Sequence, residues 1–172
     1  VNSVASQWGG MHDAWTIEFW FKTSTDSDMK ILEFYNGSDN QNRIIISTIA
    51  SSNEISILPY DGDGYTGGGT LLTTGFDFRD GKWHHMAFTS SGTAKQIYID
   101  GKLNRTDSVA CNRDDDPSMK LYVGADKDGG NKFTGQIEEL RMFSDVRTEA
   151  EIRANMFVNV HGDISGDALA AR

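Results

Sequence analysis

Residues 83–107 read WHHMAFTSSGTAKQIYIDGKLNRTD, and this stretch decides the fold. Turn signals at residues 90–92 (Ser-Ser-Gly) and 100–101 (Asp-Gly) divide it into three short segments. Asp-Gly favours a two-residue hairpin, because both central positions need positive φ and these two residues tolerate it. The stretch therefore predicts a three-stranded antiparallel meander.

The predicted strands of this meander each carry an apolar face. Met86 and Phe88 share one face of the first strand, and Ile97 and Ile99 share one face of the second, because side chains alternate along a strand. A sheet with one apolar face must bury that face against another layer. The rest of the chain is expected to supply this second layer.

Residues 14–23 (AWTIEFWFKT) form the strongest strand pattern outside the meander. Its alternate large apolar residues are Trp15, Ile17, Phe19 and Phe21. Trp20 falls on the opposite, polar face, where two interpretations are open. Its ring packs flat over the second face of the sheet, or it forms a platform on which a sugar stacks.

The remaining chain predicts more short strands and one helix. The strand segments are residues 29–35, 43–51, 54–58, 70–74, 119–124 and 133–143. In the last segment the apolar positions fall out of step, which predicts a bulge around Glu138-Glu139. Residues 148–156 predict a helix, because Thr148 and Glu151 form a capping box at its start.

About eleven short strands with one late helix are typical of an all-β fold. We therefore predict an antiparallel β-sandwich of the jelly-roll type with one short C-terminal helix. Residues 1–157 are expected to form this single domain, and the polar segment 158–172 an exit linker or tail. The sequence opens on Val1 rather than Met, which predicts an excised domain or a processed fragment, and we expect the domain to be part of a larger multi-domain chain.

The charge and composition exclude several functions. A net charge of −9 argues against nucleic acid as a partner, because that partner needs a basic surface. No apolar run is long enough to insert into a membrane. A single cysteine allows no internal disulfide.

Acidic residues gather in glycine-rich turns, which are either solvated loops or calcium-binding loops, because carboxylate oxygens are calcium ligands. Residues 61–69 (DGDGYTGGG) contain five glycines and predict a long loop at the rim of the domain, and residues 125–132 predict another. The candidate calcium ligands are Asp61, Asp63, Asp126, Asp128 and Glu138. The candidate ligand-binding residues are Trp20, Tyr60, Asp61, Asp63 and Tyr65.

Six stretches in order, AWTIEFWFKT, GKWHHMAFT, QIYIDGKL, LYVGAD, FTGQIEELRMF and RTEAEIRANM, carry a resemblance. Together they are similar to the laminin-G-like, or concanavalin-A-like, lectin superfamily, and most to its pentraxin-related branch. The resemblance implies a recognition module of extracellular, cell-surface or virion proteins that often holds calcium and binds glycans or proteins. It also implies a calcium-ligand position at Glu138, where Asp is more usual, and a pairing of Glu139 with Arg141 or backbone donors.

The sequence argues against catalysis. Laminarinase-type hydrolases share this fold and need two carboxylates around the scissile bond, usually in an E-x-D-x-x-E run that is missing here. On a regular strand the adjacent Glu138 and Glu139 would face opposite sides, and so would His84 and His85. Both histidines are therefore expected to be structural.

Three functions stay open at this point. The first is a non-catalytic module that binds a glycan or glycoprotein, with calcium as an expected cofactor. The second is a structural or adhesion spacer in a cell-surface or virion fibre. The third is a hydrolase-like jelly roll, which a cleft with two facing carboxylates would support.

Overall fold

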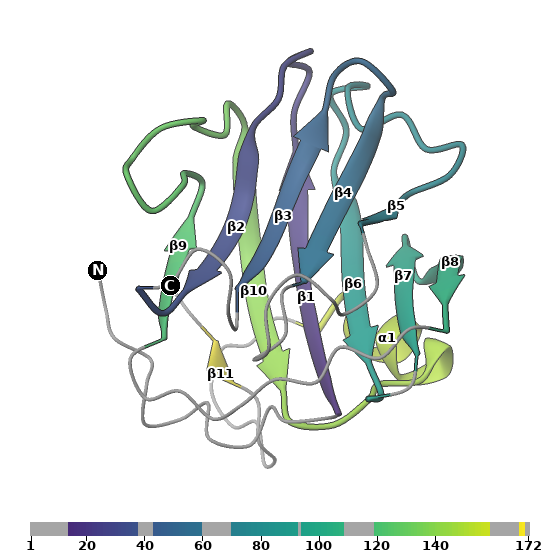
Figure 1. Ribbon diagram of the computed structural model, residues 1–172. Helices are drawn as coiled ribbons and strands as arrows, with labels where there is room; N and C mark the ends of the chain where they lie inside the picture. Colours follow the sequence, from purple (N-terminus) through teal and green to yellow (C-terminus); the bar gives the residue numbers. More distant parts are fainter. Residues whose placement is uncertain are drawn as a thin grey trace.

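The computed structural model describes residues 14–37, 43–59, 70–92, 94–108, 119–158 and 169–170. Two antiparallel sheets lie face to face in this part of the chain, as predicted (Figure 1). In spatial order, the six-stranded sheet contains β11 (Leu169–Ala170), β10 (Gln136–Phe143), β1 (Trp15–Lys22), β6 (His84–Ser90), β7 (Lys95–Ile99) and β8 (Lys102–Asp107). The five-stranded sheet contains β5 (Leu71–Leu72), β4 (Glu54–Pro59), β3 (Ile44–Ile49), β2 (Lys30–Tyr35) and β9 (Lys120–Val123).

The meander predicted from residues 83–107 is confirmed as β6, β7 and β8. Asp100 and Gly101 form its second turn with φ values of 51° and 72°, as the Asp-Gly hairpin requires. The Asp100 carboxylate also accepts a hydrogen bond from the backbone N–H of His85 at 2.9 Å, and its other oxygen lies 2.9 Å from Nδ1 of His84. These contacts tie the hairpin turn to the start of β6.

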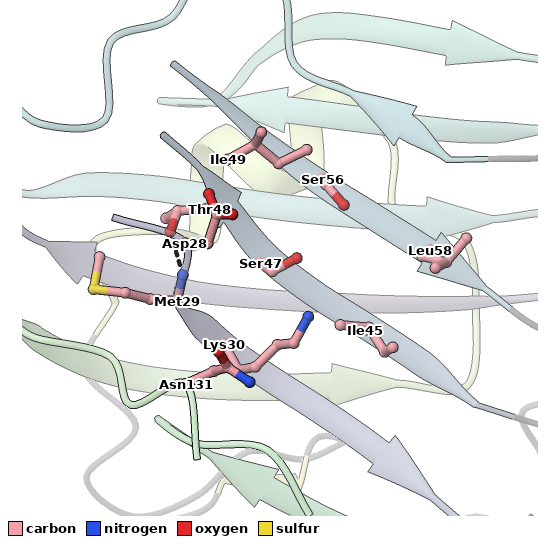
Figure 2. A pocket seen from close by; sticks show the side chains of 10 residues that line it. All are labelled: Asp28, Met29, Lys30, Ile45, Ser47, Thr48, Ile49, Ser56, Leu58 and Asn131. Carbon is pink, nitrogen blue, oxygen red and sulfur yellow. Dashed lines mark hydrogen bonds between the residues drawn. The ribbon is translucent and has the colours of Figure 1, made fainter. Parts of the chain in front are cut away.

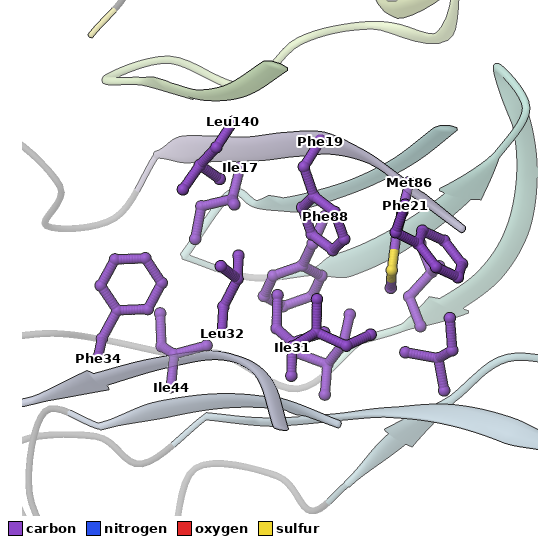
Figure 3. Packing of buried hydrophobic residues seen from close by; sticks show 14 of the residues in the cluster. Ile17, Phe19, Phe21, Ile31, Leu32, Phe34, Ile44, Met86, Phe88 and Leu140 are labelled. Carbon is purple, nitrogen blue, oxygen red and sulfur yellow. The ribbon is translucent and has the colours of Figure 1, made fainter. Parts of the chain in front are cut away.

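The core fills the space between the two sheets (Figure 3). The alternating residues of β1 predicted to face inward, Trp15, Ile17, Phe19 and Phe21, are all fully buried. Trp15 contacts Phe88 of β6 edge to face, with ring centroids 5.1 Å apart. Residues of β2 and β3 such as Leu32, Phe34 and Ile44 pack against them from the opposite layer. Period-two patterning therefore built the sandwich as expected.

The single described helix, α1 (Glu149–Asn155), packs on the outer face of the six-stranded sheet. The predicted capping box is present, because the Thr148 hydroxyl accepts from the N–H of Glu151 and the Glu151 side chain accepts from the N–H of Thr148. Ile152 is fully buried against Ala87 and Tyr98. No helix in the described part of the chain is long and apolar enough to span a membrane.

The bulge predicted in β10 is confirmed, and it changes which way two acids point. Trp20 pairs with Glu138, whereas Glu18, two residues earlier, pairs with Arg141, so β10 carries one extra residue. That residue is Glu139, with a φ of 51°. The expectation that Glu138 and Glu139 face opposite sides was wrong, because alternation fails at a bulge and both carboxylates line the same outer groove.

The segment 158–172 was predicted to be an exit linker or tail. Within it, Leu169 and Ala170 pair with Met142 and Arg141 as β11, at the edge of the six-stranded sheet. This part of the segment therefore belongs to the sandwich. A strand of two residues is too short to be recognised from a sequence pattern.

A buried charged cluster joins α1 to the six-stranded sheet. Glu18 and Arg141 are almost fully buried, and Nη1 of Arg141 donates to Glu18 at 3.2 Å and to the carbonyl of Asn155 at 2.8 Å. Nη2 donates to Glu139 at 3.1 Å, as the resemblance implied, and to the carbonyl of Val158. The guanidinium thus satisfies carbonyl groups at the C-terminal end of the helix, where a cation is favoured.

His85 lies in the same cluster and predicts a pH dependence of stability. Burial, aided by the Arg141 charge, lowers the pKa of His85 to about 4. Between about pH 4 and pH 6.5 the unfolded chain therefore binds more protons at this site, and stability falls as the pH drops through this window. We expect His85→Gln to remove up to about 3 kcal/mol of this acid-induced loss, since one pKa unit corresponds to about 1.4 kcal/mol.

Urea unfolding of the wild type and of His85→Gln at pH 7 and pH 4.5 measures this effect. Burial raises the pKa of Glu18 despite Arg141, so Glu18 acts in the opposite direction. Because its Oε2 lies 3.9 Å from Nε2 of His85, the same comparison is also made in a Glu18→Gln background. A difference in unfolding free energy that stays constant with pH would contradict the assignment.

Candidate functional site

A hollow of about 280 Å³ lies on the outer face of the five-stranded sheet (Figure 2). Strand alternation builds it: Ile44 and Ile46 of β3 point into the core, so Ile45 and Ser47 point outward. Its lining residues are Asp28, Met29, Lys30, Ile45, Ser47, Thr48, Ile49, Ser56, Leu58 and Asn131.

A polar row crosses three strands of this hollow. Lys30 of β2 is the register partner of Ser47 of β3, and Ser47 is the partner of Ser56 of β4. The Lys30 side chain extends over β3 toward Ser47 and Ile45 (Figure 2). Lys30 forms no ion pair with any described residue. An ammonium group and two hydroxyl groups therefore face one space.

An aliphatic row runs beside the polar one. Ile45 pairs with Leu58 in the adjacent register position, and Ile49 lies farther along β3. At the margin, the backbone carbonyl of Asn131 accepts a 2.8 Å hydrogen bond from the N–H of Lys30, which fixes the loop after β9 against β2. The hollow thus combines an apolar floor with polar groups at one side.

The buried carboxylate of Glu33 holds the same loop from the other end. Glu33 is fully buried, and its Oε1 lies 2.6 Å from Nη2 of Arg43. Its Oε2 accepts a hydrogen bond from the backbone N–H of Lys127 at 2.9 Å. Because a buried charge must be paired, this acid is a structural anchor of the site's border.

The groups in the hollow suit the binding of a polyhydroxylated ligand rather than bond cleavage. Hydroxyl and amide groups can donate to and accept from sugar hydroxyls, the Lys30 ammonium can donate to them, and an aliphatic floor can contact the C–H face of a sugar ring. Asp28 is the only acid among the described lining residues, and its Oδ1 accepts a hydrogen bond from the N–H of Ala50. The two facing carboxylates that glycoside hydrolysis requires are not found among these residues.

Trp20, the one sequence-predicted ligand residue that the structure describes, does not line this hollow. Trp20 lies on the outer face of the other sheet, half-buried, with its Nε1 donating to the carbonyl of Met156 at 2.8 Å. Its ring meets the ring of His85 edge to face. The other predicted ligand residues, Tyr60, Asp61, Asp63 and Tyr65, lie outside the described residues.

Of the sequence-predicted metal ligands, the structure describes Asp126, Asp128 and Glu138, and Glu138 lies apart from the other two. Glu138 is exposed on the outer face of the six-stranded sheet, whereas Asp126 and Asp128 belong to the loop beside β2 in the five-stranded sheet. Where the structure describes the chain, no three His, Cys, Asp or Glu side chains are grouped to hold a metal ion. Calcium binding that involves Asp61 and Asp63 stays a prediction.

Asp126 organises its own loop. Its Oδ1 accepts from the N–H groups of Asp128 and Gly130, and its Oδ2 accepts from Nδ2 of Asn131 at 2.7 Å. The Asn131 amide and the Gly130 N–H lower the pKa of Asp126. An ionised carboxylate has about four acceptor positions, so this residue keeps about one for a cation.

We expect Asp126→Ala to lower the melting temperature in the presence of a chelator, because the carboxylate itself holds the loop. The folded-state pKa is depressed, so this stabilisation is present above the unfolded pKa of the group and is lost as the pH falls through the folded value. Thermal melts of wild type and variant, with EDTA and with calcium, measure the effect. A loss that appears only in calcium would instead make Asp126 a metal ligand, as the sequence predicted.

Sequence reasoning missed the residues that form the polar row. Lys30, Ser47 and Ser56 sit in strand segments that were predicted correctly, but their proximity depends on strand register. The signal was present as small polar residues at alternate positions within β-branched runs. Such positions are also ordinary in solvated strands, so only the register made them a site.

A family profile identifies the superfamily to which the chain belongs. A family profile of laminin-G type, described as the concanavalin A-like lectin/glucanases superfamily, matches residues 2–153. The chain belongs to this superfamily. A search of curated proteins found no significant match.

Solved structures share the superfamily fold with this chain. A SAP-like pentraxin from Limulus polyphemus has a TM-score of 0.68 and 13% identity over 93% of this chain and 80% of its own. A candidate carbohydrate-binding protein from Bacteroides ovatus has a TM-score of 0.64 and 20% identity over 84% of this chain. The binding domain of botulinum neurotoxin DC, solved in complex with SialylT, has a TM-score of 0.64 and 17% identity over 86% of this chain.

This chain matches most of the pentraxin but less than half of the other two structures. The chain spans 41% of the Bacteroides protein and 36% of the toxin binding domain. At these identities the likeness is one of fold. The Bacteroides protein is described as a carbohydrate-binding protein and the toxin domain as a binding domain, and what they bind is a property of those proteins.

Proposed function

We propose that this domain is a non-catalytic recognition module that binds glycans, or glycoproteins through their glycans, at the hollow on the five-stranded sheet. The observation that carries the proposal is the row of Lys30, Ser47 and Ser56 beside an aliphatic floor. The superfamily membership and the carbohydrate-binding description of a structural neighbour support it. Calcium is proposed as a stabiliser of the neighbouring loops.

The size of the hollow bounds the ligand. At about 280 Å³ it lies at the lower end of the range for small-ligand sites, roughly 300–1,000 Å³. One sugar ring fits such a space, with the rest of an oligosaccharide outside it. The ammonium of Lys30, which forms no ion pair with a described residue, favours sugars that place a hydroxyl or an acidic substituent beside Ser47.

We place the module outside the cell, on a cell or virion surface, within a larger multi-domain protein. The neighbours that exceed this chain in length, with only 41% and 36% of their chains matched, support a modular context. Proteomic detection of the parent protein in the secreted or surface fraction tests this placement, and recovery from the cytosol alone would refute it.

A glycan array of neutral and acidic sugars, read with and without a chelator, tests the main proposal. We expect Lys30→Gln to weaken binding of the best ligand about tenfold or more, because a hydrogen bond to a charged group contributes about 1.5–3 kcal/mol. Lys102→Gln on exposed β8 is the matched control and should bind like the wild type. Absence of glycan binding in both conditions would refute the proposal, whereas equal binding by Lys30→Gln would move the site away from the hollow.

A further inference from the structure

A second concavity lies on the opposite side of the sandwich, on the outer face of the six-stranded sheet. It is a groove of about 270 Å³ between β1, the bulge of β10 and the C-terminal end of α1. Its lining residues are Trp20, Trp83, Glu138, Glu139, Met156 and Phe157. This groove is independent of the hollow that carries the proposed glycan site.

Aromatic rings form the walls of the groove. Trp20 is held in place by the hydrogen bond from its Nε1 to the carbonyl of Met156 and by an edge-to-face contact with His85 at 5.3 Å. Phe157 lies 5.4 Å from the Trp20 ring and is 72% exposed, which is unusual for a phenylalanine in a folded domain. Trp83, half-buried, adds a second indole. The groove therefore presents aromatic surface, of which the Trp20 ring is held in place by the fold.

The charge of the groove is negative. Glu139 is paired with the Arg141 guanidinium, which also balances the buried Glu18. Glu138, placed in the groove by the bulge, forms no hydrogen bond or ion pair with any described residue. No lysine or arginine is among the described lining residues. Among the described residues, this exposed carboxylate beside two indoles has no counter-charge.

We propose that this groove binds an organic cation, an alkylammonium or methylated ammonium group. The faces of indole rings attract such cations through the ring quadrupole, and tryptophan is the most effective side chain for this purpose. Glu138 supplies the opposite charge at the mouth of the groove. A neutral sugar would gain the aromatic contact but not the charge attraction, so the cation is the occupant that uses both features.

Two sources could supply this chemistry, a lysine side chain of a partner protein and a small free quaternary ammonium ion. The probes are therefore N-α-acetyl-lysine methylamide and tetramethylammonium, each titrated into the full chain and followed by the indole N–H signals in NMR spectra. tert-Butanol is the control ligand, because it is close to tetramethylammonium in shape and has no charge. We expect at least one cation to bind about tenfold or more tightly than tert-butanol, and the tighter cation identifies the source.

Glu138→Gln separates this role from a structural one, because the exposed, unpaired side chain contributes little to folding. The variant should lose about tenfold in cation affinity while tert-butanol binding stays unchanged. Glu54→Gln at the start of β4 is the matched control and should match the wild type. Lys30→Gln should also leave cation binding unchanged, which keeps the outcome separate from that of the glycan proposal.

The proposal is overturned by any of three results. These are no shift of either indole signal with both cations, equal affinity for tetramethylammonium and tert-butanol, and full cation affinity in Glu138→Gln. Methyl glucoside that shifts the same indole signals as strongly as the cations would equally assign the groove to a neutral sugar.

Discussion

Replacement of Arg141 by methionine is expected to lower the melting temperature by about 10 °C. The substitution leaves Glu18 buried without its partner, and breaking one side of a buried ion pair costs about 3–5 kcal/mol. It also removes the donors to the carbonyl groups of Asn155 and Val158. For a domain of this length each kcal/mol corresponds to about 2–4 °C. Differential scanning calorimetry at pH 7 measures the shift.

Two further variants make this result interpretable. Arg105→Met on exposed β8 makes the same chemical change without a buried partner, and it should alter the melting temperature by less than about 2 °C. The double variant Glu18→Gln with Arg141→Met should be more stable than Arg141→Met alone, because it leaves no unpaired buried charge. If Arg141→Met melts like Arg105→Met, the buried pair does not anchor α1.

A single added methyl group at Gly135 is expected to destabilise the domain by about 3 kcal/mol, the upper end for an overpacked site. The Cβ of an alanine there would lie 2.2 Å from the backbone carbonyl oxygen of Lys22 and 2.8 Å from Cε1 of Phe133. A backbone oxygen cannot move aside without disturbing the end of β1. We therefore expect a decrease in melting temperature of about 6–12 °C.

Gly129→Ala is the matched control for this substitution. Gly129 has a φ of 78°, but a Cβ there would meet no heavy atom within 4 Å. Its alanine variant should lose only about 1–2 kcal/mol, the cost of the left-handed conformation for an L-residue. Equal losses for the two variants would show that the close approach of the strands at Gly135 is relieved by small adjustments.

The sequence predicted those elements that are determined by a few neighbouring residues. Three such features are the capping box at Thr148 and Glu151, the Asp-Gly turn at residues 100–101 and the alternation of β1. The structure confirms each of them. A pattern of period two or a capping pair needs no knowledge of distant chain segments.

Features that depend on distant segments could not be predicted in this way. Glu18 and Thr16 occupy the polar face of β1, yet both are buried, because α1 and residues 145–147 return to cover that face. The polar row of the hollow likewise depends on register between β2, β3 and β4. Asp126 as a cation ligand stays a prediction, and the donors of its own loop that the structure shows on its oxygens could not be foreseen from the sequence.

The extra residue Glu139 reverses the alternation of inward and outward side chains in the second half of β10. Strict alternation from Ile137 would turn Leu140 and Met142 to the solvent and aim the Arg141 guanidinium at the interior. Deletion of one residue here would therefore move the side chains of the second half of the strand to the opposite face. The same deletion in an exposed turn would have only a small effect. A homologous chain without this insertion can keep the sandwich only by exchanging its apolar and polar positions downstream, so an alignment should open a gap at this point.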